Sequence, residues 1–497
     1  MGIVFRQSIK STIVIFTGNL IGAVATYFTA QVFSQDKQQF GFSRTLITVG
    51  VISMICILMG AASVMQTFTQ RYEKRDERKK VLISLCFLAP LLMALCLLPF
   101  YLGFKAEIVA MFKPQDRAYF SDYYGWVALL VLAWGYLTLL EAYMISQHKS
   151  AQGLVMREVF LRVCNLLALG ALYWQLIRFH GFIVLTVLGY VLSAILLLLL
   201  SMRTEGFGFS RRWKVFTRGE YKEIFRFAWY HLLVGVSVYL TGYLDGLLLA
   251  TLDKDGVSAV PAYTIAVFIV GLMAVPYRAM AQAVFPALNR AYIERNDAEL
   301  RDIFNRSGIN ILIVAVAMAF IIGLNLNNAA SILPKGYEKI VPLSLILMLG
   351  RAVDMATGVN TEMISISIYY KFNFRISAIL VVLIVVLCWL LIPRYGAYGA
   401  AWGSSIALTI FNIAKLIFLK KKMALHPFSL QSLKVILAGI VSGLIAYFIP
   451  YLGNPVVDAL LRAGTLIIIY TPLLLWWRVS PDINEYLATV VKKKRLF

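Results

Sequence analysis

The sequence predicts an all-α polytopic membrane protein with about fourteen transmembrane helices. Sixty per cent of its 497 residues are hydrophobic, whereas only 14% are charged. The stretches 11–33, 45–68 and 81–104 are each longer than 20 residues and carry no charged side chain. About 20 apolar residues are enough for a helix to cross the hydrocarbon core. A lone amphipathic surface helix has a different pattern, so the chain is expected to cross the membrane many times.

Further spans are expected wherever an apolar stretch lies between polar connections. They are 11–33, 45–68, 81–104, 123–146, 159–177, 181–202, 227–252, 257–285, 307–326, 340–368, 376–392, 396–419, 435–452 and 456–477. The fifth, eleventh and thirteenth of these spans are short or hold a charge. The longest connection runs only from 203 to 226, so no soluble domain is expected.

The net charge of +22 is distributed unevenly over the connections. Thirty-two of the 47 Lys and Arg residues lie in one alternating set of connections and ten in the other. Basic residues collect on the cytoplasmic side, so both termini are expected there. The basic runs 71–80, 203–226 and 492–495 then set the topology and lie against anionic headgroups, or bind an acidic partner. A nucleic-acid partner is not expected.

No motif in the sequence indicates a cofactor. The five cysteines are scattered singly and lack the spacing of a metal site, which favours a packing role. No GxxxxGK[ST] sequence occurs, so ATP is not expected to drive any transport. The one small ligand left open is a coupling cation, either H⁺ or Na⁺.

Weak internal repeats indicate that the chain consists of two related halves. Short matches recur at equivalent positions with an offset of 216 to 219 residues: Asp36-Lys37 with Asp253-Lys254, Met144-Ile145-Ser146 with Met363-Ile364-Ser365, and Arg178 with Arg394. Six spans per half is an even number, so the two lobes share one orientation. Their pseudo-two-fold axis then runs along the membrane normal, as in transporters built from parallel repeats.

This repeat gives the expected domain organisation. An N-lobe covers 1–202 with spans one to six, and a cytoplasmic basic linker covers 203–226. A C-lobe covers 227–420 with spans seven to twelve. Residues 421–497 add two appended spans and a basic cytoplasmic tail.

The segment IPRYGAYGAAWGSS, residues 392–405, carries glycines in an apolar region. Gly399 and Gly403 form a GxxxG pair, with Gly396 nearby. Small residues let helix backbones approach closely in lipid, so these glycines are expected to pack one helix on its neighbour. A moving contact in a transport cycle is the alternative.

The same segment resembles the "LIP-x-yG-a-x-GAA" segment of the oligosaccharide flippases, Wzx-like members of the multidrug, oligosaccharidyl-lipid and polysaccharide exporter superfamily. Three other stretches resemble this family in the same order: EIFRFAWYHLLVGVSVYLTGYLDGLLLA at 223–250, VFPALNRAYIERNDAELRDIFNRS at 284–307 and ILPKGYEKIVPL at 332–343. The resemblance implies two six-helix lobes around a cavity, plus two appended helices. It also implies translocation of an undecaprenyl-pyrophosphate-linked oligosaccharide for polysaccharide biosynthesis, such as the O-antigen of lipopolysaccharide.

The sequence departs from the family pattern at two places. The family often has an Arg after the Asp that ends the seventh span, whereas Gly246 follows Asp245 here. The related lipid II flippases carry arginines in the first span, where this chain has only Asn19 and Gln31 as polar candidates. A detailed cationic pyrophosphate site therefore cannot be transferred from the family.

Charged side chains within the membrane indicate where a substrate site lies, because they are costly and usually face a cavity. Arg278 and Arg351 are candidates for holding a pyrophosphate, since a planar guanidinium matches phosphate oxygens. Tyr277 and Asp354 are added as cavity candidates. Asp354 lies one helical turn from Arg351, so a local ion pair is the alternative for that arginine. Snorkelling to the interface is the alternative for Arg278.

Four further residues are candidates for coupling transport to a cation. Asp245 and His231 lie in the seventh span, Glu362 in the tenth and Glu141 in the fourth. Each acidic residue has interfacial solvation or a structural partner as its alternative role. For His231 the alternative is a packing contact.

Two other functions remain open at this point. An ion-coupled multidrug exporter of the same superfamily would have the same fold. A membrane glycan polymerase or ligase would be an enzyme, but it needs acid, base or phosphate-binding groups in a sizeable external loop. The largest external connection runs only from 105 to 122, so no enzyme is expected. The expected location is the bacterial inner membrane, with polysaccharide polymerase machinery as a further partner.

Overall fold

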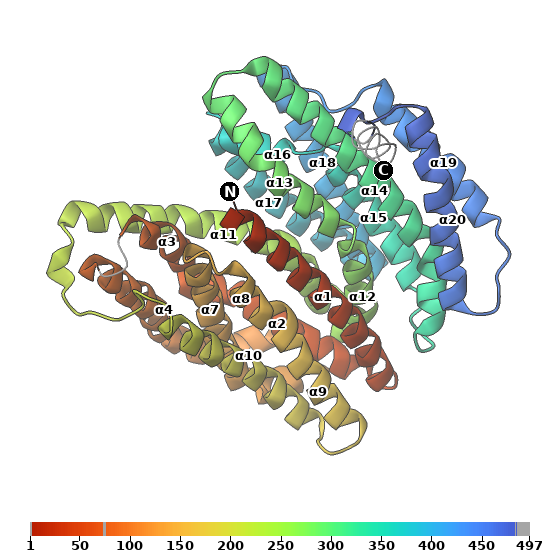
Figure 1. Cartoon of the computed structure of the whole chain (residues 1–497). Coiled ribbons are helices and arrows are strands. Elements are labelled where there is room, and N and C mark those ends of the chain that lie inside the picture. The colour runs from red at the N-terminus through yellow and green to blue at the C-terminus, as the bar shows by residue number, and fades with distance from the viewer. Residues whose placement is uncertain (1, 73–75, 483, 485–497) are drawn as a thin grey trace. The chain divides into compact units, whose positions relative to one another are not determined.

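The computed structural model describes residues 2–72, 76–482 and 484, and within them the side chains of 2–12, 234, 237 and 238 are excepted. The regular secondary structure of these described residues is entirely helical (Figure 1). The chain divides into two compact units, an N-terminal unit Met1–Pro261 and a C-terminal unit Ala262–Phe497. The predicted basic tail at 492–495 lies outside the described residues, as do 73–75 of the basic run 71–80.

The N-terminal unit is a helical bundle around α7. Its long helices are α1 (Gly2–Val32), α2 (Lys37–Leu58), α4 (Glu77–Gly103), α7 (Tyr124–Ser146), α10 (Phe179–Met202) and α11 (Arg218–Leu252). Shorter elements are α3 (Ala61–Phe68), α5 (Lys105–Ala110), α6 (Arg117–Asp122), α8 (Ser150–Leu154), the π-helical turn η2 (Val155–Phe160), α9 (Leu161–Tyr173) and the 3-10 turn η4 (Gly256–Ala259). Helix α7 packs against α2, α3, α4 and α10 (Figure 1). Its Leu130, Leu137 and Tyr143 are almost completely buried.

The second predicted span, 45–68, is not one continuous helix. Helix α2 ends at Leu58, and α3 begins at Ala61 after two residues with positive φ, Met59 at 47° and Gly60 at 77°. A Cβ at Gly60 would overlap the Ala228 carbonyl of α11. The chain breaks here because α11 approaches so closely that only glycine fits.

The C-terminal unit contains two bent helix pairs that a hydropathy pattern does not reveal. Helices α12 (Val260–Gly271) and α13 (Ala274–Ile293) belong to a pair bent by 41°. Helices α15 (Ile340–Ala356) and α16 (Asn360–Ile366) form a pair bent by 46°. The tenth predicted span, 340–368, is therefore a broken helix.

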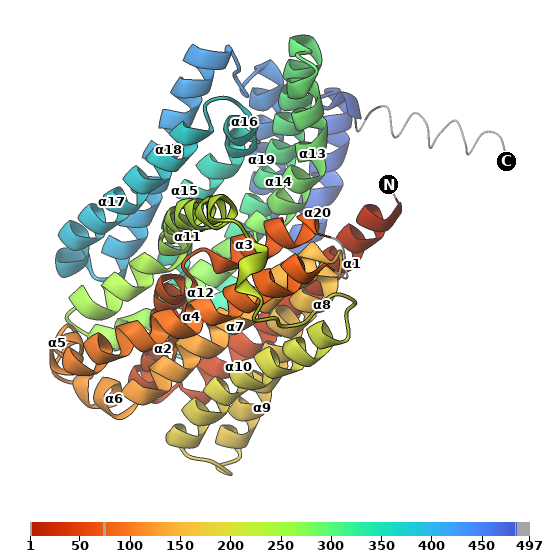
Figure 2. The ribbon, with the colours of Figure 1, turned by 90° about the vertical axis from the view of Figure 1, so that its left-hand side faces the viewer.

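The C-terminal unit has five further long helices among the described residues. They are α14 (Asp297–Ile332), α17 (Tyr370–Tyr395), α18 (Ala397–Met423), α19 (Leu430–Tyr447) and α20 (Pro455–Trp476). Helices α17 and α18 lie side by side, and α19 and α20 pack together against α14 (Figure 2). The ion pair between Asp458 and Arg462, 2.6 Å between Oδ2 and Nε, fixes the start of α20. Arg462 also donates to the carbonyls of Ala446, Tyr447 and Ile449 at the end of α19.

The described residues contain ten helices that are long and apolar enough to cross a membrane, or twelve if each bent pair counts as one span. The fifth predicted span falls on α9, which has only 13 residues but continues α8 and η2 without a break. The seventh falls on α11 and includes side chains outside the described residues. The predicted fold class is confirmed: this is an all-helical, multi-pass membrane protein. The division into equivalent six-helix lobes stays a prediction.

Candidate functional site

The C-terminal unit contains a chain of polar side chains that begins on α15. Arg351 and Asp354 form the expected local ion pair, with 3.0 Å between Nη1 and Oδ2. The other carboxylate oxygen of Asp354 accepts a hydrogen bond of 3.0 Å from the Asn412 amide on α18. Both oxygens of Asp354 are thus engaged, and Arg351 is not a free cation.

The break between α15 and α16 continues this polar chain. Gly358, with φ at 65°, makes the turn between the two helices. The Asn360 amide at the start of α16 donates to the Thr357 hydroxyl at 2.7 Å and to the Asn412 carbonyl oxygen at 3.2 Å. The Asn360 side chain therefore connects the break to both Thr357 and α18.

Lys415 on α18 ends the polar chain. Its side chain is almost completely buried, at 1% exposure. The ammonium donates to the Thr361 hydroxyl at 2.8 Å and lies 3.8 Å from the centre of the Phe411 ring. Asp354 and Glu362 both interact with this ammonium electrostatically. A buried lysine that contacts a hydroxyl and an aromatic face is costly unless nearby carboxylates balance its charge.

An open cavity of about 380 Å³ lies beside these polar side chains, within the same unit. Its polar lining consists of Tyr277, Arg278, Gln282, Thr361, Glu362 and Ser365. The structure thus brings together three of the predicted residues, Tyr277, Arg278 and Glu362. Arg351 and Asp354 do not line this cavity. Arg278 is exposed, whereas Oε2 of Glu362 is buried and has no hydrogen-bond partner in the described structure.

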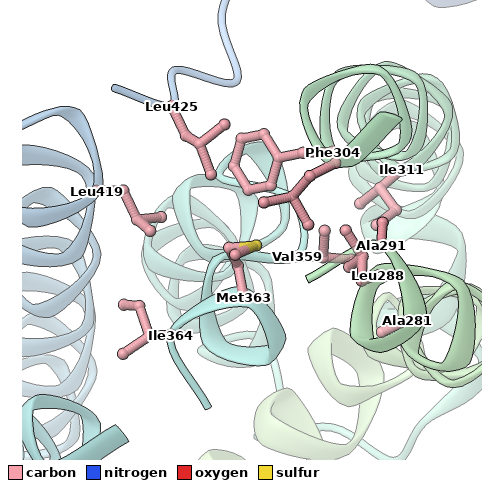
Figure 3. Close-up of a cluster of buried hydrophobic side chains, with 11 residues drawn as sticks. Ala281, Leu288, Ala291, Phe304, Ile311, Val359, Met363, Ile364, Leu419 and Leu425 are labelled. Atoms are coloured by element: carbon pink, nitrogen blue, oxygen red, sulfur yellow. The ribbon is translucent and has the colours of Figure 1, made fainter. Parts of the chain in front are cut away.

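The opposite face of α16 belongs to an apolar cluster, which holds the short helix in place (Figure 3). Val359, Met363 and Ile364 pack there with Phe304 of α14 and Leu419 of α18, and all five are fully buried. Helix α16 begins with three polar residues, which Met363 and Ile364 follow. Asn360, Thr361 and Glu362 face the polar chain and the cavity because their apolar neighbours are fixed in the cluster.

The N-terminal unit has a separate charged cluster at η2. Glu141 of α7 pairs with Arg157 of η2, with 2.8 Å between Oε2 and Nη1. Arg157 also pairs with Glu158 at 3.2 Å, and Glu158 pairs with Arg162 at 2.7 Å. Helix α1 approaches this cluster through Gly18, where a Cβ would lie 2.8 Å from the Glu158 Cβ. The alternative of a structural partner for Glu141 is therefore realised.

A second cavity, of about 250 Å³, opens next to this cluster within the N-terminal unit. Glu141, Arg157, His231 and Tyr239 line it, together with apolar residues of α2 such as Leu58. Two predicted coupling residues, Glu141 and His231, thus share one cavity. The His231 ring stacks on Phe227 at 3.9 Å, and its Nδ1 lies 3.0 Å from the Phe227 carbonyl oxygen. This contact makes Nδ1 the donor and directs Nε2 away from the backbone.

Asp245, the third coupling candidate of this unit, lies on α11 and lines neither cavity. Its Oδ1 accepts a hydrogen bond of 2.8 Å from the Gly246 backbone. The structure therefore does not bring Asp245 to the cavity that Glu141 and His231 share.

The predicted packing glycines lie at the contact of α17 and α18. Gly396, with φ at 57° and ψ at −134°, is the single residue that joins the two helices. A Cβ at Gly399 would overlap the Leu391 carbonyl, and one at Gly403 would lie 2.9 Å from the Cys388 sulfur. Close backbone approach thus depends on glycine at both positions.

Sequence reasoning missed several members of both sites. It did not single out Arg157 and Glu158, because they lie in a basic connection, or Asn360 and Asn412, because single amides in apolar spans give a weak signal. Lys415 had a usable signal: it is a charged residue inside the twelfth predicted span, one turn before Leu419. The rule that intramembrane charges are functional candidates applies to it directly.

Comparisons with known proteins identify the architecture. No protein-family model matches the chain, and no curated protein matches it. Among solved structures, the lipid II flippase MurJ in an inward closed conformation matches with a TM-score of 0.74 and 14% identity, over 95% of this chain and 99% of that one. An inward-facing multidrug resistance MATE transporter of the MOP superfamily matches with a TM-score of 0.65 and 15% identity, over 83% of this chain and 98% of that one.

A MOP-superfamily transporter from Pyrococcus furiosus matches with a TM-score of 0.58 and 14% identity, over 84% of this chain and 95% of that one. The chain has the fold of these transporters. At this level of identity the match concerns the fold, and it leaves the Wzx-like resemblance a prediction. Fold alone does not define function, so function has to be argued from the sites.

Proposed function

We propose that the protein is a flippase that moves a lipid-linked oligosaccharide across the bacterial inner membrane by alternating access. The observation that carries this proposal is the match to the lipid II flippase over nearly the full length of both chains, 95% and 99%. That protein's name describes a lipid-linked substrate, and the sequence resemblance to the oligosaccharide flippases points to the same class. The MATE match covers only 83% of this chain.

The cavity of the C-terminal unit supports a substrate with an anionic headgroup. Arg278 is exposed at this cavity, beside the hydroxyl group of Tyr277 and the amide of Gln282. A guanidinium and neutral donors suit a pyrophosphate and the hydroxyls of a sugar. Arg351 pairs with Asp354 and does not line this cavity, so the proposal rests on Arg278. In this account the glycan occupies polar cavities while the lipid tail stays in the bilayer.

The proposal includes the expected topology and partners. Both termini are proposed to lie in the cytoplasm, and the distribution of Lys and Arg supports this. The energy source is a coupling cation rather than ATP. The flipped product is then used by polysaccharide polymerase machinery on the far side of the membrane, for example in O-antigen synthesis.

A multidrug exporter is the second candidate, because MATE transporters share the fold. Glu362 and Glu141, which line the two cavities, are the residues that would attract a cationic drug. This candidate predicts a change in drug susceptibility on deletion, with normal lipid-linked oligosaccharides.

Deletion of the gene in its host tests the proposal. We expect completed lipid-linked repeat units to accumulate in the cytoplasmic leaflet, and a plasmid copy to remove them. Truncated units would indicate a missing sugar-transfer step instead. Completed units already exposed on the outer side would indicate a polymerase or ligase, and unchanged lipids with altered drug susceptibility would indicate an exporter.

A further inference from the structure

Lys415 is a buried cation whose surroundings differ from those of an ordinary ion pair. Lysine has three N–H donors, and the Thr361 hydroxyl takes one of them at 2.8 Å. The Phe411 ring covers the ammonium at 3.8 Å. Asp354 and Glu362 interact with it electrostatically, but none of the ion pairs among the described residues includes Lys415. The charge is therefore balanced at a distance by carboxylates on α15 and α16.

Glu362 is the carboxylate whose protonation state can still change. Asp354 is held by Arg351 and Asn412 through both of its oxygens. Glu362, in contrast, has a buried Oε2 with no hydrogen-bond partner in the described structure. Its side chain also lines the open 380 Å³ cavity, so water has a route to the carboxyl group. Protonation would convert this oxygen from an unpaired acceptor to a donor.

Neighbouring helices bring further charged and polar groups close to Lys415 and Glu362. Helix α15 contributes Asp354 and Arg351, which form an ion pair. Helix α13 contributes Arg278 and Tyr277 at the cavity. Helix α17 contributes the neutral amide of Asn373, which donates to the Thr361 carbonyl at 3.3 Å.

These surroundings do not fit a metal cation. A hard cation needs several oxygen ligands within one small space. The candidate oxygens of Thr361 and Asn412 already accept hydrogen bonds from Lys415 and Asn360. The ammonium itself repels a second cation, since charges a few ångströms apart interact strongly when buried. The described residues also contain no cluster of three His, Cys, Asp or Glu side chains suited to a metal.

We propose that Lys415 and Glu362 form a proton-exchange site and that H⁺ rather than Na⁺ is the coupling ion. The inference rests on the proposed transport function and narrows its energy source. Lys415 supplies a fixed positive charge that acts on the Glu362 carboxylate. A proton from cavity water binds to the carboxylate of Glu362, which lines the cavity, and the same proton leaves to water when the cavity faces the other side. No other bond forms or breaks in this step.

The broken helix couples this exchange to movement. Glu362 lies on α16, whereas Asp354 lies on α15, and Gly358 with φ at 65° joins the two helices. Neutralising Glu362 removes the one carboxylate charge on α16 that attracts Lys415. The Lys415–Thr361 hydrogen bond then remains as a polar contact between α16 and α18. A change of one proton thus alters the interaction between two helices within this unit.

Infrared difference spectroscopy on the full-length protein tests this inference without any substrate. The protein is reconstituted in vesicles of phosphatidylethanolamine and phosphatidylglycerol, and spectra are recorded before and after acidification. We expect a protonated-carboxyl band that disappears in Glu362→Gln and persists in Glu294→Gln, an exposed glutamate of the same unit. When choline in the buffer is replaced by Na⁺ at constant pH, the difference spectrum should contain no band that depends on Glu362.

A second variant tests the role of the lysine. Lys415→Met should shift the pH at which the Glu362 band appears, because a nearby positive charge stabilises the carboxylate. A lysine with only a packing role would leave this pH unchanged, and this outcome would overturn the inference. So would a carboxylate band that responds to Na⁺ and depends on Glu362. If Glu362→Gln does not fold, the shift in Lys415→Met decides alone.

The infrared experiment and the gene deletion test the coupling ion and the transported substrate separately. A proton-driven drug exporter would pass the infrared test, yet its deletion would leave lipid-linked oligosaccharides unchanged. A Na⁺-driven flippase would show the opposite pair of results.

Discussion

Arg351 and Asp354, one helical turn apart on α15, form an ion pair of 3.0 Å whose acidic member is also held by Asn412. The sequence left open whether Arg351 binds substrate or pairs with its neighbour. In the structure this arginine has a partner, and it does not line the cavity beside Arg278. The pair therefore supports the broken helix, and Arg278 is the arginine available for an anionic ligand.

Removal of Arg351 alone should destabilise the protein. In Arg351→Ala, Asp354 stays partly buried with Asn412 as its remaining hydrogen-bond partner, and loss of a hydrogen bond to a buried charged group costs roughly 1–3 kcal/mol. The double variant with Arg351→Met and Asp354→Leu should recover part of this loss, since apolar pairs often replace buried ion pairs at little cost. Calorimetric unfolding in detergent measures both. A stable single variant with no transport would instead assign Arg351 to the substrate.

Substitution of Arg278 should affect transport without affecting stability. The exposed guanidinium has no ion-pair partner among the described residues, so Arg278→Ala leaves no buried charge behind. Loss of a charge-assisted contact of ~1.5–3 kcal/mol weakens binding about tenfold or more. Accumulation of lipid-linked oligosaccharide in the complemented deletion strain is the measurement.

Arg290→Ala is the matched control for this variant. Arg290 lies on the same helix, α13, but outside the cavity, and its side chain is 68% exposed. It should complement the deletion fully. Equal transport by both alanine variants, at equal expression, would remove Arg278 from the site.

Loss of Arg157 should lower the stability of the protein more than neutralisation of Glu141 does. Arg157→Ala leaves the buried Glu141 carboxylate without its 2.8 Å partner, whereas Glu141→Gln leaves Arg157 paired with Glu158. We therefore expect Arg157→Ala to lower the unfolding temperature more than Glu141→Gln does. The reverse order would mean that Glu141 is held by groups other than Arg157.

The contact of α17 and α18 should not tolerate a methyl group at Gly403. Its Cβ would lie 2.9 Å from the Cys388 sulfur, and overpacking of this kind costs about 1–3 kcal/mol. Gly464→Ala on α20 is the control, because a Cβ there meets nothing within 4 Å. That variant should be neutral or gain up to ~1 kcal/mol from helix propensity. Equal unfolding temperatures of the two variants would contradict the packing role.

Most of the fold was predictable because it follows from hydropathy. Runs such as 81–104 and 181–202 coincide with α4 and α10 within a few residues. The breaks were not predictable, because they depend on neighbouring helices rather than on local sequence. The break after Leu58 arises where the Ala228 carbonyl approaches Gly60, and the break at Gly358 is stabilised by Asn412, more than 50 residues away in the chain.

The candidate site was predicted only in part. One cavity is lined by Arg278, Tyr277 and Glu362. This was predictable in part because a charged side chain within an apolar span usually faces a cavity and not the lipid. The grouping of Glu141 with His231 depends on the bundle that brings α7 to α11, which no local pattern encodes. The same holds for Lys415 and Thr361, whose hydrogen bond joins two helices separated by α17 in the sequence.

Translocation itself is tested most directly in proteoliposomes that contain lipid-linked oligosaccharide extracted from the deletion strain. A glycosidase that cannot cross the bilayer is added outside, and the cleaved fraction of the glycan is followed over time. We predict that the wild-type protein raises this fraction above the level in protein-free vesicles, and that Arg278→Ala raises it much less than Arg290→Ala. A cleaved fraction equal to that of protein-free vesicles, with correctly folded protein, would contradict the assignment as a flippase of this lipid.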